Sequence, residues 1–201
     1  MKIDTTKLKD NNISKKDKRK YILLSLLFAI VLIVLDQLSK DLIIKDYEVS
    51  EGKPVIKGII EILHIKNKGS AWGMFHNKPV IPIIIACILI LLIMYVYKNL
   101  LGYKHYRGLR ICIVFLLSGA LSNIIDRIRI GSVTDFIYFK FVDFPVFNVA
   151  DIYVTFSIAI MLFLLIFRYK GADIDVMLGS SYIDEDGKYV DKDSKKKTDD
   201  K

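Results

Sequence analysis

Four long apolar stretches dominate the pattern of hydrophobic and polar residues along the chain. They cover residues 21–35, 79–97, 109–125 and 152–167. The second stretch has no charged residue, and as an α-helix it would extend about 28 Å, close to the thickness of the hydrocarbon core of a bilayer. The pattern predicts four membrane-spanning helices, which places both ends of the chain on the same side of the membrane.

The first apolar stretch has an alternative interpretation as a secretory signal peptide, because a basic segment precedes it. No small-residue cleavage site follows, however, and the apolar pattern resumes over residues 41–44 after Asp36 and Lys40. We therefore interpret this stretch as the first span.

Basic residues indicate the orientation of the spans. The first 20 residues carry eight Lys or Arg, and the turn of residues 98–110 carries four more. Short cytoplasmic segments of membrane proteins are enriched in Lys and Arg. Residues 45–78 also hold six lysines, but four acidic residues offset them. We expect both termini to be cytoplasmic.

The segments outside the spans differ in character. Residues 50–76 combine β-branched residues in partial alternation with a Gly-rich turn, which predicts a small β-rich cradle on the extracytoplasmic side, since an open sheet edge in lipid would leave backbone groups unpaired. Residues 1–20 are expected to form a basic cytoplasmic tail, and residues 168–201 a charged, flexible one. The predicted fold is therefore an all-α membrane domain over residues 21–167.

Composition supports this prediction. The chain is 53% hydrophobic with a mean hydropathy of +0.37, and its charges are separated from the apolar stretches. The net charge of +8 does not indicate nucleic-acid binding, because many of the basic residues lie in the tails. Cys87 and Cys112 lie inside apolar stretches, and His64, His76 and His105 are scattered, so neither a disulfide framework, a metal site nor a Ser/His triad is indicated.

Polar residues at the ends of the spans are the candidates for chemistry, because an ionisable residue in a membrane is costly and usually functional. With the predicted topology they gather at the extracytoplasmic end: Asp36, Lys40, Asn123, Asp126, Arg127, Asp135, Asn148 and Asp151. A structural alternative is that they only link the helices by hydrogen bonds.

Paired carboxylates without a metal indicate aspartic proteolysis, in which one acid is protonated and the other ionised. Asp126 is followed by Arg127, which we expect to pair with it. Asp135 and Asp151 have apolar neighbours instead, and desolvation favours the neutral form of an acid. We choose Asp135 and Asp151 as the dyad.

Four motifs in chain order carry a resemblance to a known family. They are DQLSK at residues 36–40, NKGSAWG at 67–73, GALSNIIDR at 119–127 with GSVTDF behind it, and FNVAD at 147–151. Together they resemble bacterial lipoprotein signal peptidase (signal peptidase II), a family of integral-membrane aspartic proteases. The resemblance covers about residues 21–167. Ser70 and Ser122 stand where the family usually has Ala and Gly, and Trp72 has two interpretations, an interfacial anchor or a substrate contact.

The resemblance implies an endopeptidase that cleaves prolipoproteins on the amino side of a cysteine already carrying diacylglycerol, in the bacterial cytoplasmic membrane and without a cofactor. Membrane lipids and lipid-modified prolipoproteins would be its partners. Asp135 and Asp151 correspond to the family's dyad. Residues that would shape the pocket or support the dyad are Asp36, Lys40, Asn67, Gly69, Asn123, Asp126, Arg127, Asn148 and Ala150.

Two other functions compete with this one. A small transporter or proton relay would also use membrane carboxylates, but it needs polar residues near the bilayer midplane, whereas here they gather at one end. A non-enzymatic scaffold would use its polar residues only for packing, so loss of Asp135 or Asp151 would change stability rather than a reaction.

Overall fold

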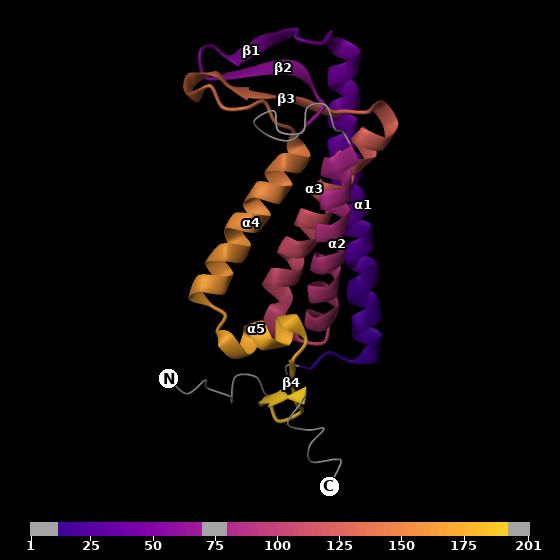
Figure 1. The fold of residues 1–201 in the computed structure, drawn as a ribbon, viewed down its shortest axis with the longest axis vertical. Helices are drawn as coiled ribbons and strands as arrows, with labels where there is room; N and C mark the ends of the chain where they lie inside the picture. The colour runs from indigo at the N-terminus through magenta and orange to yellow at the C-terminus, as the bar shows by residue number, and fades with distance from the viewer. Residues whose placement is uncertain (1–11, 70–79, 193–201) are drawn as a thin grey trace.

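The computed structural model describes residues 12–69 and 80–192 (Figure 1). Within these residues, four helices are long and apolar enough to cross a membrane, which confirms the predicted spans. They are α1 (Lys15–Asp46), α2 (Val80–Leu100), α3 (Arg107–Ile130) and α4 (Val149–Phe167), and the 3-10 turn η3 (Lys104–Tyr106) precedes α3.

Helix α1 begins earlier than the sequence pattern suggested. Its N-cap is Ser14, whose hydroxyl accepts the backbone N–H of Asp17 at 3.1 Å. Because this cap satisfies one of the free N–H groups at the helix start, residues 15–20 continue the helix instead of forming a separate tail. The five basic residues between positions 15 and 20 therefore lie on the first turns of α1.

Helix α3 is the centre of the bundle, since it packs against α1, α2 and α4. More than half of its apolar stretch is buried, whereas the other three helices expose most of theirs, as expected for surfaces that face lipid. Gly119 lets α4 approach closely, because a Cβ there would lie 2.5 Å from the carbonyl oxygen of Ala150. This contact fixes the start of α4 against α3.

A three-stranded antiparallel sheet covers one end of the bundle (Figure 1). Its order is β1 (Gly52–Ile56), β2 (Ile60–Asn67) and β3 (Val133–Phe139). The first two strands lie in the predicted β-rich segment, whereas Ser70, Trp72 and the rest of residues 70–76 lie outside the described residues.

Strand β3, which contains Asp135, was not among the elements predicted from the sequence. Gly131 ends α3 with a positive φ of 72°, which turns the chain back towards β2. The β-branched and aromatic residues that follow then pair with β2, and Asp135 lies opposite Ile65. The 3-10 turn η4 (Lys140–Val142) follows the strand.

The chain from the end of α4 to residue 192 also differs from the flexible tail we expected, whereas residues 193–201 of that tail lie outside the described residues. Residues 171–191 form helix α5 (Gly171–Leu178) and a hairpin of β4 (Ser181–Ile183) and β5 (Tyr189–Asp191), at the end of the bundle opposite the three-stranded sheet (Figure 1). Val176, Met177 and Ile183 share a buried cluster with residues of the α2–α3 end. The apolar residues of this segment are few, but the bundle end supplies the rest of the core.

Candidate active site

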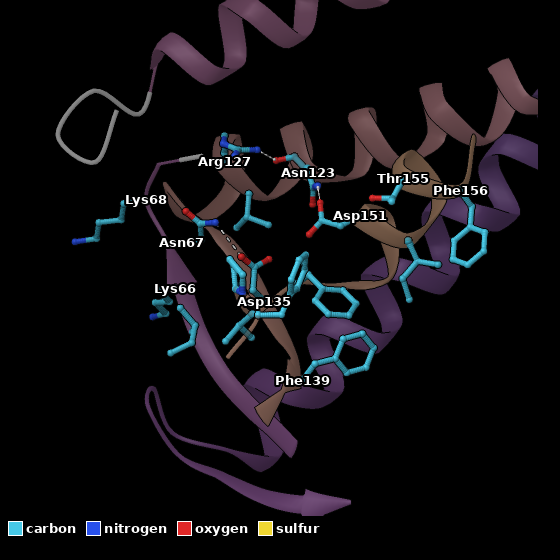
Figure 2. A pocket seen from close by; sticks show the side chains of 17 residues that line it. Lys66, Asn67, Lys68, Asn123, Arg127, Asp135, Phe139, Asp151, Thr155 and Phe156 are labelled. Atoms are coloured by element: carbon cyan, nitrogen blue, oxygen red, sulfur yellow. Dashed lines mark hydrogen bonds between the residues drawn. The ribbon is translucent and has the colours of Figure 1, made fainter. Parts of the chain in front are cut away.

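The two predicted dyad acids lie on different elements and line the same cavity. Asp135 lies on β3 and Asp151 in the first turn of α4, and both are directed towards an open cavity of about 900 Å³ (Figure 2). Asp135 is buried, with 3% of its surface exposed. The turn at Gly131 and the close contact at Gly119 are the local features that bring these elements together.

Asn148 joins the two acids directly. Its side-chain Nδ2 donates to Asp135 Oδ1 at 2.6 Å, and its Oδ1 accepts the backbone N–H of Asp151 at 3.0 Å. The backbone N–H of Asn148 donates to Asp151 Oδ2 at 3.2 Å, which completes a capping box at the start of α4. A single N-cap residue thus fixes both the helix start and the two acids.

Asn67 and Asn123 hold the remaining carboxylate oxygens. Asn67 Nδ2 donates to Asp135 Oδ2 at 2.9 Å, and Asn123 Nδ2 donates to Asp151 Oδ1 at 2.8 Å. Each amide is oriented from behind, because Gly69 N donates to Asn67 Oδ1 and Lys40 Nζ donates to Asn123 Oδ1. Since a lysine and a backbone N–H can only donate, the NH2 groups must face the acids.

A buried ion triad of Asp36, Lys40 and Asp126 supports the two segments that carry the dyad acids. Lys40 Nζ lies 2.7 Å from Asp36 Oδ2 and 3.0 Å from Asp126 Oδ2, and the lysine is 1% exposed. Asp126 Oδ2 also accepts the N–H of Thr134, and Asp36 Oδ1 accepts the N–H of Ala150. Each acid of the triad therefore holds the residue that immediately precedes a dyad acid.

Arg127 does not have the role that we expected. It donates to the carbonyl oxygen of Gly69 at 3.0 Å and to that of Asn123 at 3.2 Å, whereas Asp126 forms its ion pair with Lys40. Adjacent residues on a helix do not face each other, so Asp126 and Arg127 point in different directions. Arg127 instead connects α3 to the end of β2.

The environment of Asp135 suits an acid that carries a proton near neutral pH. Burial and the nearby charge of Asp151 raise the pKa of Asp135 to about 7, although the hydrogen bonds from Asn67 and Asn148 oppose this shift. Lys40 donates to Asn123 rather than to either dyad acid, so no ammonium group forms an ion pair with them in the described part of the chain.

Sequence reasoning missed three residues of the site, Gln37, Ser122 and Thr134. Gln37 Nε2 donates to Asp126 Oδ1 at 2.7 Å, and Ser122 Oγ donates to Asp36 Oδ2 at 2.6 Å. Both residues lie inside motifs that we had quoted, but their partners are more than 80 positions away. No local pattern shows such pairing.

Much of the cavity lining is apolar. It includes Phe139 and Phe156, which are labelled in Figure 2, together with Phe144, Pro145, Val146, Phe147 and Ile152. A cavity lined by two carboxylic acids and several aromatic side chains can bind a peptide that carries apolar groups next to the bond facing the acids.

Four membrane-crossing helices with a pair of amide-oriented carboxylates at one end define a membrane-embedded aspartic peptidase. The family model described as signal peptidase (SPase) II matches residues 28–167. The chain therefore belongs to the signal peptidase II family.

Relatives and solved structures agree with this assignment. The lipoprotein signal peptidase of Streptococcus agalactiae serotype Ia is 36% identical over 139 residues, which are 66% of this chain and 84% of the relative. That of Brevibacillus brevis is 37% identical over 136 residues, 68% of this chain and 90% of the relative. A bacterial membrane enzyme solved at 1.9 Å superimposes with a TM-score of 0.66 and 30% identity, covering 75% of this chain and 96% of that structure.

Proposed function

We propose that this chain removes signal peptides from prolipoproteins, with Asp135 and Asp151 as the catalytic dyad. The observation that carries the proposal is the link through Asn148, which donates to Asp135 and caps the helix turn that holds Asp151. This geometry presents two carboxylates to one cavity, as acid–base cleavage without a covalent intermediate requires.

The two acids have different environments, which suggests different roles. Asp135 has a pKa of about 7 and is the partner that holds the proton. Both acids accept two hydrogen bonds, but only Asp151 lies in the first turn of a helix, α4, where the helix dipole favours its ionised form.

In the proposed reaction, Asp151 removes a proton from water while the water oxygen bonds to the scissile carbonyl carbon, and Asp135 gives its proton to the carbonyl oxygen. The tetrahedral species then returns a proton to Asp135 as the carbonyl re-forms. The C–N bond breaks, and the leaving nitrogen takes the proton held by Asp151. Both acids end in their starting states.

The substrate is proposed to be a prolipoprotein whose cysteine already carries diacylglycerol, cleaved on the amino side of that cysteine. The aromatic wall of the cavity, which includes Phe139 and Phe156, supports this assignment because it offers an apolar surface beside the acids. A lipid-anchored substrate reaches such a cavity by diffusion in the bilayer plane. No cofactor takes part in the proposed steps.

We propose that both termini are cytoplasmic and that the dyad lies at the extracytoplasmic face of the cytoplasmic membrane. Basic residues at the start of α1 and around η3 support this orientation, because they lie at the end of the bundle away from the three-stranded sheet (Figure 1). Residues 21–167 would form the peptidase domain, with cytoplasmic segments on either side.

The proton-relay alternative has less support. Helix α2 contains no Asp, Glu, Lys or Arg before Lys98, and the acids of the other helices that enter the site network lie together at the sheet end. A relay needs exchangeable groups through the full depth of the membrane.

Cleavage of a purified, diacylglyceryl-modified prolipoprotein tests the proposal directly. The protein is reconstituted in lipid, and the products are identified by mass spectrometry. We expect a new N-terminus at the modified cysteine, and no cleavage of a matched substrate whose cysteine lacks the lipid. Failure to cleave the lipidated substrate, with acidification of reconstituted vesicles instead, would favour a relay.

A further inference from the structure

Two neutral side chains, Gln37 on α1 and Ser122 on α3, connect the same two acids that Lys40 joins. Gln37 Nε2 donates to Asp126 Oδ1 at 2.7 Å and to Ser122 Oγ at 3.0 Å. Ser122 Oγ in turn donates to Asp36 Oδ2 at 2.6 Å. These bonds form a continuous path from Asp126 to Asp36, which we call the neutral bridge.

The orientation of the Gln37 amide follows from its outer contact. Arg129 Nη1 donates to Gln37 Oε1 at 2.9 Å, and a guanidinium cannot accept a hydrogen bond. The NH2 group of Gln37 must therefore face Asp126 and Ser122. Ser122 is fully buried, so its hydroxyl depends on these partners.

The neutral bridge supplies a hydrogen-bond donor to an oxygen of Asp126 that Lys40 does not contact. Lys40 and the N–H of Thr134 both bond to Oδ2 of Asp126, whereas Gln37 bonds to Oδ1. Without Gln37, the buried Oδ1 would lose its donor, and the carboxylate could rotate to regain one. Such a rotation would weaken the bond to Thr134, the residue before Asp135.

Ser122 acts on the other acid, Asp36, by adding a second donor to the oxygen that Lys40 already contacts. Asp36 Oδ1 accepts the N–H of Ala150 at 2.8 Å, while Oδ2 accepts from Lys40 and Ser122. The hydroxyl thus helps to hold the carboxylate plane that fixes Ala150, the residue before Asp151.

We propose that Gln37 and Ser122 are positioning residues for the cleavage reaction, acting on Asp135 through Asp126 and on Asp151 through Asp36. This inference rests on the proposed function. It identifies contacts that support the dyad in addition to the ion pairs of Lys40 in the triad.

The test uses Gln37→Met, which keeps the side-chain length but removes the amide, and Ser122→Ala. Leu38→Met is the matched control, because Leu38 is the next residue on α1 and is 55% exposed. For the first two variants we expect turnover per folded enzyme to fall about tenfold with KM changed less than about twofold, because misplacement of catalytic groups acts mainly on the chemical step. The control keeps its turnover.

The pH profile of Gln37→Met separates positioning from simple loss of fold. Burial and the charge of Asp151 are the two largest causes of the raised pKa of Asp135. Displacement of β3 away from α4 would weaken both, lower that pKa and move the alkaline limb of turnover to lower pH. An unmoved limb, with turnover reduced only in proportion to the folded fraction, would overturn the inference.

Hydrogen exchange keeps this test independent of the proposed function. In Gln37→Met the amide of Thr134 should exchange about tenfold faster, and in Ser122→Ala that of Ala150, because their acceptors are no longer fixed. If amide exchange is unchanged in both variants, the inference is overturned. If the protein without any substitution never cleaves the substrate, only the proposed function is overturned.

Discussion

Three asparagines, Asn67, Asn123 and Asn148, turn their NH2 groups towards the dyad acids. With the backbone N–H of Asn148, which donates to Asp151 Oδ2, they give each dyad oxygen one hydrogen bond. None of these oxygens accepts a hydrogen bond from a lysine or arginine among the described residues. Neutral donors hold the acids in place without the full charge that would keep both ionised. This arrangement lets one proton remain on the pair.

The pH dependence of turnover is expected to reflect Asp135. Its pKa of about 7 means that the acid is protonated below that pH and ionised above it, so turnover should fall as the pH rises through about 7. Asn67→Leu removes a hydrogen bond that lowers this pKa, so the fall should move to higher pH. The measurement is turnover against pH at saturating substrate.

Glu61→Gln is a suitable control for that shift. Glu61 lies on β2 like Asn67, but its side chain pairs with Lys140. If the fall in turnover with rising pH moves equally in both variants, or moves to lower pH in Asn67→Leu, the assignment of the proton to Asp135 is contradicted.

The two acids of the proposed dyad could be chosen as candidates from the sequence, but the residues that contact and support them only in part. Asp135 and Asp151 stand in apolar surroundings within recognisable motifs, so their chemistry is visible locally. The bonds of Gln37 and Ser122, and the choice of Lys40 over Arg127 as the partner of Asp126, depend on contacts between α1 and α3. Spacing along one helix does not specify such contacts.

The contact between α3 and α4 sets the position of Asp151. Gly119 lies against the carbonyl of Ala150 and the side chain of Val154, and Ala150 also donates to Asp36. Any side chain at position 119 would push the first turn of α4 away from the bundle. Close packing through small residues is a common device in membrane helices.

Gly119→Ala is therefore expected to reduce both stability and turnover. The new Cβ would lie 2.5 Å from the Ala150 oxygen, and relief of that overlap should cost about 1–3 kcal/mol of unfolding free energy. Gly108→Ala on the same helix is the control, since its Cβ would lie 3.7 Å from Leu164. Thermal midpoints and turnover in detergent provide the measurement, and equal behaviour of the two variants would argue against the close contact.

The helices were predictable from hydropathy, whereas β3 was not. A span depends on about 20 consecutive residues and carries its own signal. Strand β3 contains a charged residue among apolar ones, and it becomes a strand because β2 offers an edge far away in the sequence. The register that places Asp135 opposite Ile65 is a property of that pairing.

The molecule has a second ordered end, opposite the dyad. There the carboxylate of Asp173 accepts hydrogen bonds from Tyr106 at 2.8 Å and Tyr189 at 2.6 Å, and it lies 3.2 Å from His105 Nε2. Burial alone would raise the pKa of Asp173, but these bonds and the N–H of Lys170 lower it to about 2. This polar centre fastens α5 and the hairpin to the bundle.

Asp173→Asn should consequently destabilise this end at neutral pH. A carboxyl whose pKa is lower in the folded state stabilises the fold above its unfolded pKa of about 3.9, and this contribution is lost as the pH falls towards 2. We expect a loss of about 1–3 kcal/mol at pH 7, seen as a lower thermal midpoint. Asp175→Asn, on the exposed face of α5, should have little effect.

The order of this segment could not be predicted, because its few apolar residues find their partners only at the α2–α3 end. Val176 and Ile183 are buried against Leu100 and Leu109, residues that belong to distant parts of the chain.

For Asp173→Asn, a difference in unfolding free energy of less than about 0.3 kcal/mol from the protein without the substitution would contradict the role of Asp173 in attaching α5 and the hairpin to the bundle.

The most direct test of the whole account is cleavage of the diacylglyceryl prolipoprotein by single-acid variants that remain folded. Asp135→Asn and Asp151→Asn should abolish turnover, Asp126→Asn should retain some, and Asp143→Asn should cleave normally, because Asp143 bonds to Tyr138 instead of the dyad. Normal cleavage by Asp135→Asn, with Asp126→Asn inactive, would show that Asp151 has a different partner.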